Sequence, residues 1–185
     1  MIGGGNIKKL LFLIFIVAIL FLAGCNQDKY SNDESAAIVN NKEITVGEIK
    51  SLHSIEDGNL KLIVRNYVKE EIMVQEAMKR QIDISDKVDE ALEGYIFPAE
   101  PPKGKENPIL NFYKKQADKL DMSPEDYAEF YIEKTTKRRE YTKKYIENEL
   151  GTPNQLDDAE YQNKLNELYD NLLIKYKDNV EIYIK

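Results

Sequence analysis

The chain has 185 residues, and its 26 Lys and Arg residues against 33 Asp and Glu residues give a net charge of −7. This acidic balance argues against a DNA- or RNA-binding protein, because such proteins carry an excess of positive charge. The single cysteine excludes an internal disulfide bond. With 42% hydrophobic and 32% charged residues but only nine Gly and six Pro, the composition is typical of a soluble, largely helical globular protein.

The first 24 residues have the pattern of an export signal peptide. Lys8 and Lys9 precede an unbroken apolar run from Leu10 to Leu22. The run is shorter than the roughly 20 residues that a membrane-spanning helix needs, and polar residues follow it directly, as in a cleaved signal. Since Lys8 and Lys9 are the only charged residues of this segment, the remaining chain has 24 basic and 33 acidic residues and a net charge of −9.

The end of this segment contains the only cysteine of the chain. Leu22, Ala23 and Gly24 directly precede Cys25. This sequence resembles the bacterial lipobox, in which the cysteine thiol receives a diacylglycerol and the cysteine then becomes the new N-terminus. Two acyl chains are sufficient for stable anchoring. We therefore predict lipidation of Cys25 and attachment to the extracytoplasmic face of the cell membrane; the alternative is a simple signal anchor with an incidental cysteine.

The region after the signal predicts a tether and then one domain. Residues 25–35 are polar and lack an apolar period, so we expect a flexible tether followed by a domain at residues 36–185. At the start of the domain, short apolar segments flank Asn40 and Asn41, which tolerate positive φ angles. This pattern predicts a tight β-hairpin over residues 36–45.

The C-terminus carries a second strand signal. Apolar and polar residues alternate over residues 180–184, as expected for a β-strand. Isolated strands need partners for their backbone hydrogen-bonding groups. We therefore expect the C-terminal strand to pair with the N-terminal hairpin.

The region between the strands has helical spacing of its apolar residues. It predicts helices over about 45–52, 59–80, 85–92, 107–120, 123–150 and 152–176. Two neighbouring apolar stripes on the helix over 59–80, the second ending at Met78, indicate a wide buried face. Thr45, Asn107 and Ser123 have the position and chemistry of N-caps, and Gly151 is placed to end a helix. Four prolines between Phe97 and Pro108 exclude a helix there. The predicted fold class is mostly α.

Two segments carry a resemblance to a known family. Residues 36–45 and the segment from Tyr67 to Asp86 resemble the N-terminal chaperone module of SurA and PrsA-type exported foldases. The family pattern is a V-N-G-x-x-I-T strand and turn, a helix with an E-x-x-x-x-E-A segment, and a G-I-x-V-S-D step. Asn41 and Gln81 stand where the family usually has glycine. The resemblance implies a SurA/PrsA-like helical module, with a small sheet pairing the N- and C-terminal strands, that binds unfolded exported chains.

Nothing in the sequence predicts an enzyme. The parvulin prolyl isomerase domain of that family is longer than the stretch from Gly94 to Met122, so we expect it to be absent. The only histidine, His53, has no local catalytic partner and is interpreted as a structural or surface residue. Cys25 is expected to be acylated, and no serine has the context of a nucleophile. Metal-ligand spacing and nucleotide motifs are lacking, so no metal or cofactor is predicted.

One long helix carries six basic residues between Lys134 and Lys144. They alternate with Glu133, Glu140 and Glu147, which favours a solvated face over a patch for nucleic acid or anionic lipid.

The aromatic residues of the same helix are the candidate peptide-binding residues. They are Tyr127, Phe130, Tyr131, Tyr141 and Tyr145. We expect most of them in the core and some along a groove, where an amphipathic ring offers contact area. The predicted function is that of a lipid-anchored chaperone that binds unfolded or extended polypeptides without catalysis. The alternative is an adaptor or scaffold lipoprotein of the cell envelope that docks one specific partner.

Overall fold

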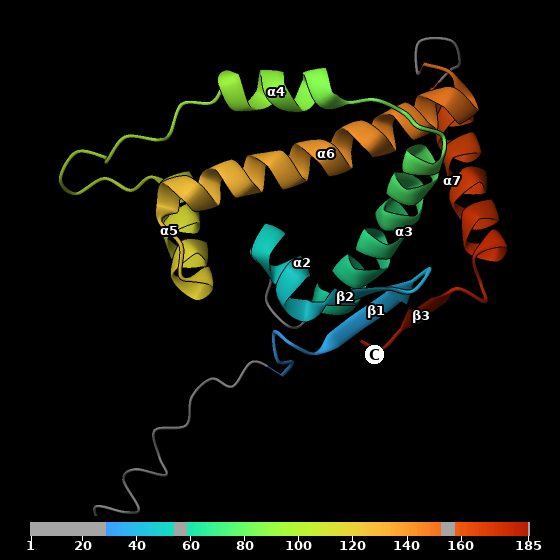
Figure 1. Ribbon diagram of the computed structural model, residues 1–185, viewed down its shortest axis with the longest axis horizontal. Coiled ribbons are helices and arrows are strands. Elements are labelled where there is room, and N and C mark those ends of the chain that lie inside the picture. Colours follow the sequence, from blue (N-terminus) through green and yellow to red (C-terminus); the bar gives the residue numbers. More distant parts are fainter. Residues whose placement is uncertain (1–28, 54–58, 153–157, 185) are drawn as a thin grey trace, which may run out of the picture.

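The computed structural model describes residues 29–53, 59–152 and 158–184 (Figure 1). In chain order its elements are β1 (Ser35–Val39), β2 (Lys42–Thr45), α2 (Val46–Leu52), α3 (Leu60–Lys79), α4 (Ser85–Glu93), α5 (Pro108–Leu120), α6 (Pro124–Leu150), α7 (Asp158–Lys175) and β3 (Val180–Ile182). The predicted class is confirmed, because the described residues form a mostly helical protein with a small antiparallel sheet.

The N-terminal hairpin forms as predicted. β1 and β2 are antiparallel, and Val39 pairs with Lys42 across a two-residue turn. Asn40 and Asn41 occupy that turn with φ angles of 49° and 68°. Asparagine is among the few non-glycine residues that adopt this left-handed region readily, so it can replace the glycine of such turns.

The two ends of the domain belong to one sheet, which has the strand order β2-β1-β3. β3 is antiparallel to β1, with Val39 opposite Val180 and Ala37 opposite Ile182 (Figure 1). The Tyr183 N–H also donates to the Ala36 carbonyl at 3.0 Å. The predicted pairing of the N- and C-terminal strands is therefore confirmed.

Helix ends follow the predicted signals. The side chains of Thr45, Asn107 and Ser123 accept hydrogen bonds from backbone N–H groups three residues later, at 3.0 to 3.2 Å. Gly151 follows α6 with a φ angle of 78°. Gln81 follows α3 with a φ angle of 56°. Glycine adopts this left-handed conformation most readily, which is the physical reason why glycine would suit position 81.

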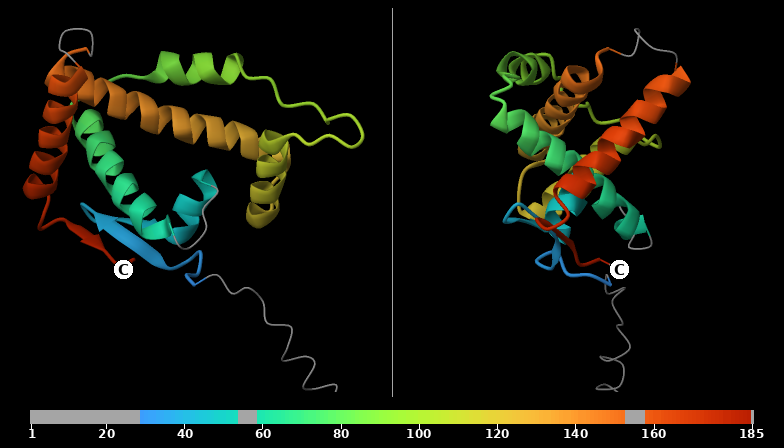
Figure 2. Two further views of the ribbon diagram at one scale, coloured as in Figure 1. Left: turned by 180° about the vertical axis from the view of Figure 1, so that it is seen from behind. Right: turned by 90° about the vertical axis from the view of Figure 1, so that its right-hand side faces the viewer.

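The long helix α6 organises the other helices. α4 lies along one side of α6, whereas α5, α2 and α3 lie on the other side (Figure 1). α5 contacts the N-terminal part of α6, and α7 lies at its C-terminal end near α3 (Figure 2). α6 therefore presents one continuous face to several elements that are distant in sequence.

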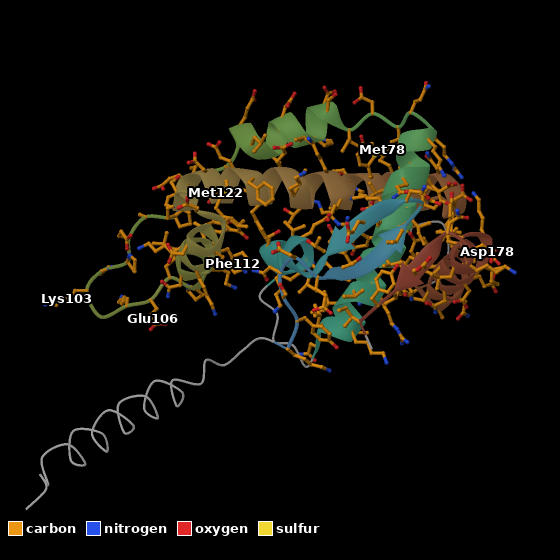
Figure 3. All side chains as sticks on the ribbon, turned by 60° about the horizontal axis from the view of Figure 1, so that its bottom comes forward. Met78, Lys103, Glu106, Phe112, Met122 and Asp178 are labelled. Carbon is orange, nitrogen blue, oxygen red and sulfur yellow. The ribbon has the colours of Figure 1, made fainter. Side chains whose placement is uncertain are left out.

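The main core lies between the sheet, α2 and α3. The stripe through Leu60, Val64, Val68 and Ile72 is buried as predicted. The second predicted stripe of α3 is wrong at its end, because Met78 is 57% exposed (Figure 3). That stripe is covered at Tyr67 and partly at Val74, so the wide buried face narrows before the helix ends.

Part of the segment assigned to the tether is bonded to the domain. Tyr30 packs against the main core. The carbonyl groups of Asn32 and Glu34 accept hydrogen bonds from Gly47 and Val46 at 2.8 and 2.9 Å. A Cβ atom at Gly47 would lie 2.9 Å from the Asn32 oxygen, so this approach requires glycine. The predicted signal peptide, the lipobox and the start signal at residues 153–155 lie outside the described residues.

Candidate functional site

One stripe of α6 carries side chains at helical spacing along the side that faces α3 and α5. Its members are Tyr131, Thr135, Arg138, Thr142 and Ile146, each three or four positions after the last. Residues at this spacing lie above one another on a helix. All five are half-buried, so the stripe is covered only in part.

A recess of about 520 Å³ lies along the C-terminal part of this stripe, and we call it the central recess. Its apolar walls come from Leu52 at the end of α2, Ile146 of α6 and Tyr161 of α7. Charged side chains from α3 and α6 also line it, namely Glu70, Arg138, Arg139, Lys143 and Glu147. An apolar recess with a few polar groups is the usual form of a binding site.

A second recess, of about 610 Å³, lies where α5 meets α6, and we call it the α5 recess. Ile109, Phe112 and Tyr113 of α5 line it together with Tyr131 of α6. Phe112 lies on the side of α5 that faces α2 (Figure 3), with its ring centroid 5.4 Å from that of Tyr131. Ile109 is 57% exposed. The two recesses therefore adjoin along one helix, since Tyr131 and Thr135 are one turn apart.

Arg138 fixes the middle of the stripe against α3. Its guanidinium donates to Glu71 Oε2 at 2.9 Å, to the Tyr67 carbonyl at 3.1 Å and to Glu70 Oε2 at 3.2 Å. It also lies 3.6 Å from the centre of the Tyr67 ring. Lys42 bonds the other carboxylate oxygen of Glu71 at 3.0 Å. Arg138 thus joins α6 to α3 through three hydrogen bonds, and Glu71 extends this contact to Lys42 of the hairpin.

Two titratable side chains beside the central recess have shifted pKa values. Partial burial lowers the pKa of His53, Glu70 opposes this shift, and Arg138 adds to it. His53 is therefore mainly neutral at neutral pH. Burial raises the pKa of Tyr67, Arg138 opposes this, and Glu48, which accepts the Tyr67 hydroxyl at 2.8 Å, adds to the rise. Tyr67 therefore remains a neutral donor at neutral pH.

The five aromatic candidates of α6 are divided between the core and the surface. Tyr127 is fully buried and Tyr145 is 2% exposed. The Tyr127 hydroxyl donates to the Ser51 carbonyl, which ties α6 to α2. Phe130, Tyr131 and Tyr141 are half-buried, and Tyr131 is the one of the five that lines the α5 recess.

Other lining residues were not among the sequence-based candidates. Leu52, Ile146 and Tyr161 of the central recess come from three elements, and Ile109 and Phe112 come from a fourth. On α6, helical spacing could have indicated the side that lines the recesses, through Tyr131, Thr135, Thr142 and Ile146. No comparable local signal marks the residues of α2, α5 and α7.

The basic run of α6 is neutralised largely within the protein. Lys137 bonds Glu133, and Arg139 bonds Glu140 at 3.0 Å. Lys143 and Lys144 both lie within 4 Å of Glu147. Five of the six basic residues are exposed, as predicted for a solvated face, whereas Arg138 is 13% exposed and belongs to the contact with α3.

Among residues 29–53, 59–152 and 158–184, no three His, Cys, Asp or Glu side chains are grouped so that they could hold a metal ion. The helices of this same part include none that is long and apolar enough to cross a membrane. No protein-family model matches the chain, and no curated protein or solved structure matches it either.

Proposed function

We propose that this protein is a lipid-anchored extracytoplasmic chaperone that holds unfolded or extended polypeptides without catalysis. The observation that carries the proposal is the pair of apolar recesses along the α6 stripe. An unfolded chain exposes apolar side chains along an extended backbone, and adjoining open recesses suit several of them better than one deep pocket would. The resemblance of residues 36–45 and 67–86 to the SurA/PrsA module supports the same function and the finer fold assignment.

The chemistry of the recesses predicts weak and adaptable binding. Ile109, Ile146 and Tyr161 offer apolar contact, and Arg138, the most buried charge of the lining, already has its acidic partners on α3. Partial burial of a few apolar side chains gives dissociation constants of order μM, about −8 kcal/mol. Such affinity suits a protein that must release its clients. It should depend little on salt, because apolar contact is not screened.

The lipobox-like residues Leu22, Ala23 and Gly24 support anchoring at Cys25. Attachment there would place the domain at the outer face of the membrane, where exported chains emerge unfolded. No residue is assigned a catalytic role, because the groups that line the recesses serve contact and folding rather than proton transfer.

The test compares two variants on α7. Tyr161→Ser removes an apolar wall of the central recess, whereas Ile174→Ser removes an apolar side chain that is 68% exposed and lines neither recess. We expect Tyr161→Ser to suppress the aggregation of several unrelated unfolded clients several-fold less well than the wild type, and Ile174→Ser to act like the wild type. Both variants should keep the wild-type melting temperature.

Equal suppression by both variants would contradict the assignment of the central recess. If unfolded clients are not held at all and crosslinking in intact cells yields a single folded envelope protein, the adaptor function should replace the chaperone function.

A further inference from the structure

The two recesses are close enough for one extended segment to occupy both. Tyr131 lines the α5 recess, and Thr142, one of the α6 residues that line the central recess, lies eleven positions later. At about 1.5 Å per residue this separation is about 16 Å along the helix. An extended polypeptide covers that distance with about five residues. A client with apolar side chains at this separation could fill both recesses at once.

The charges around the recesses differ in sign from the chain as a whole. Lys115, Arg138, Arg139 and Lys143 line them, against Glu70 and Glu147. Basic side chains outnumber acidic ones in this lining by four to two, although Arg138 bonds Glu70 and Arg139 bonds Glu140 at 3.0 Å. The whole chain, in contrast, has a net charge of −7.

Two of these basic side chains are exposed enough to reach a ligand. The side chains of Arg139 and Lys143 are 66% and 60% exposed, and each has a partner on its own helix rather than across the recess. Lys and Arg side chains of this kind extend their charged ends over neighbouring apolar surface. An acidic side chain of a bound segment would therefore lie near positive charge.

We infer that the two recesses act together and select extended segments with two apolar side chains about five residues apart and acidic residues between them. This inference rests on the proposed function, since it names the clients of the same surface. Simultaneous occupation makes the second contact intramolecular, so affinity rises only where the spacer matches the distance between the recesses. The acidic spacer adds a smaller, screened contribution.

The experiment uses labelled peptides with two leucines in a Gly/Ser background. The leucines are separated by about two, five or eight residues, and the spacer carries either two Glu or two Lys. Fluorescence anisotropy measures binding to the full-length chain in nanodiscs of zwitterionic lipid. We expect binding to be about tenfold tighter at the middle separation than for a peptide with one leucine. At low salt, Glu spacers should bind about threefold tighter than Lys spacers, and high salt should remove this difference.

Variants assign each part of the effect to a recess. Ile109→Ser and Tyr161→Ser should each abolish the dependence on leucine separation, whereas Ile174→Ser should keep it. The double variant Arg139→Gln with Lys143→Gln should remove the preference for Glu over Lys. Lys134→Gln is the matched control, because Lys134 belongs to the same basic run but lines neither recess. Unchanged circular dichroism and melting temperature confirm that each variant is folded.

A wild-type affinity that does not vary with leucine separation would overturn the inference, and so would equal binding of Glu and Lys spacers at low salt. If either result occurs while Tyr161→Ser still impairs suppression of aggregation, the proposed chaperone function stands and only the client selection is wrong. If the wild type binds no peptide and suppresses no aggregation, the proposed function fails as well.

Discussion

Glu76 should make a pH-dependent contribution to the free energy of unfolding through the contact between α3 and α7. Changing it to Gln should remove most of that contribution. Glu76 is 6% exposed. Its carboxylate accepts hydrogen bonds from the Tyr176 hydroxyl, from Lys175 Nζ at 2.9 Å and from Lys79 Nζ at 3.2 Å. Tyr176 and Lys175 lie at the end of α7, so this cluster connects that helix to α3 just before the chain enters β3.

The sign of the effect follows from the pKa of Glu76. Burial alone raises this pKa, but the hydrogen bonds from Tyr176, Lys175 and Lys79 outweigh burial and lower it from 4.5 to about 2. A carboxyl group whose pKa is lower in the folded chain stabilises the fold above its unfolded pKa. That stability is lost as the pH falls from 4.5 toward 2. The difference corresponds to about 3 kcal/mol, of which about 2 kcal/mol is lost by pH 3.

Urea unfolding followed by circular dichroism at pH 7 and pH 3 measures this loss. Between these pH values the wild type should lose about 2 kcal/mol more unfolding free energy than Glu76→Gln, which has no carboxyl group to protonate. Glu93→Gln is the control, because Glu93 is an exposed carboxylate at the end of α4. Glu93→Gln should keep the wild-type pH dependence. The same loss of stability in Glu76→Gln as in the wild type would refute the assigned cluster.

Three further predictions concern the ends of the chain and the surface of α6. Removing residues 180–185 should reduce the free energy of unfolding by several kcal/mol, out of the roughly 5–15 kcal/mol typical of a domain, and so lower the melting temperature. The reason is that β1 loses a partner strand and the core loses the buried side chain of Ile184. An unchanged melting temperature would contradict the role of this pairing. Cys25→Ala should leave the protein in the soluble fraction once signal cleavage is verified, and a cleaved variant that stays in the membrane would exclude lipidation. Tyr131→Ser combined with Tyr141→Ser should reduce suppression of client aggregation while the fold remains intact, whereas loss of folding would assign both rings to the core.

Local features of the fold were predictable because their physical causes are local. The hairpin requires two residues with positive φ between apolar segments, and Asn40 with Asn41 supplies them. The helix starts at Thr45, Asn107 and Ser123 follow from side chains that accept the first free N–H groups. The pairing of β3 with β1 was predictable for a different reason, since the C-terminal strand had no other strand to pair with than those of the hairpin.

The structural role of Arg138 was not predictable from the sequence. It is one of six basic residues within eleven positions, and nothing local distinguishes it from Arg139. The side chain of Arg138 is 13% exposed and that of Arg139 is 66% exposed. The difference arises because Arg138 faces Glu71 and Tyr67 on α3, which are distant in sequence. A charge pattern shows how many acids offset a basic run, but not which basic residue is buried.

The recesses were only partly predictable for the same reason. Aromatic residues of α6 could be selected as candidates, but whether a ring lies in the core or in a recess depends on the elements placed against it. Tyr127 is buried because α5 and α2 both cover it. Tyr161 lines the central recess because it lies in the first turn of α7, which begins beside the C-terminal end of α6 (Figure 2). Neither placement follows from the spacing of apolar residues along a single helix.

Arg138 also connects the stability of the fold to the alignment of the recesses. It lies on the α6 stripe between Tyr131 of the α5 recess and Ile146 of the central recess. A buried ion pair contributes little net stability, but separating its two charges is costly because each is left buried without its partner. The ion pair therefore disfavours other alignments of the two helices. Sliding α6 by one turn would leave Glu71 without its guanidinium and would move both recesses relative to α2 and α5. The ion pair therefore fixes the position of α6 at which the apolar walls from α2, α5 and α7 meet its inner stripe.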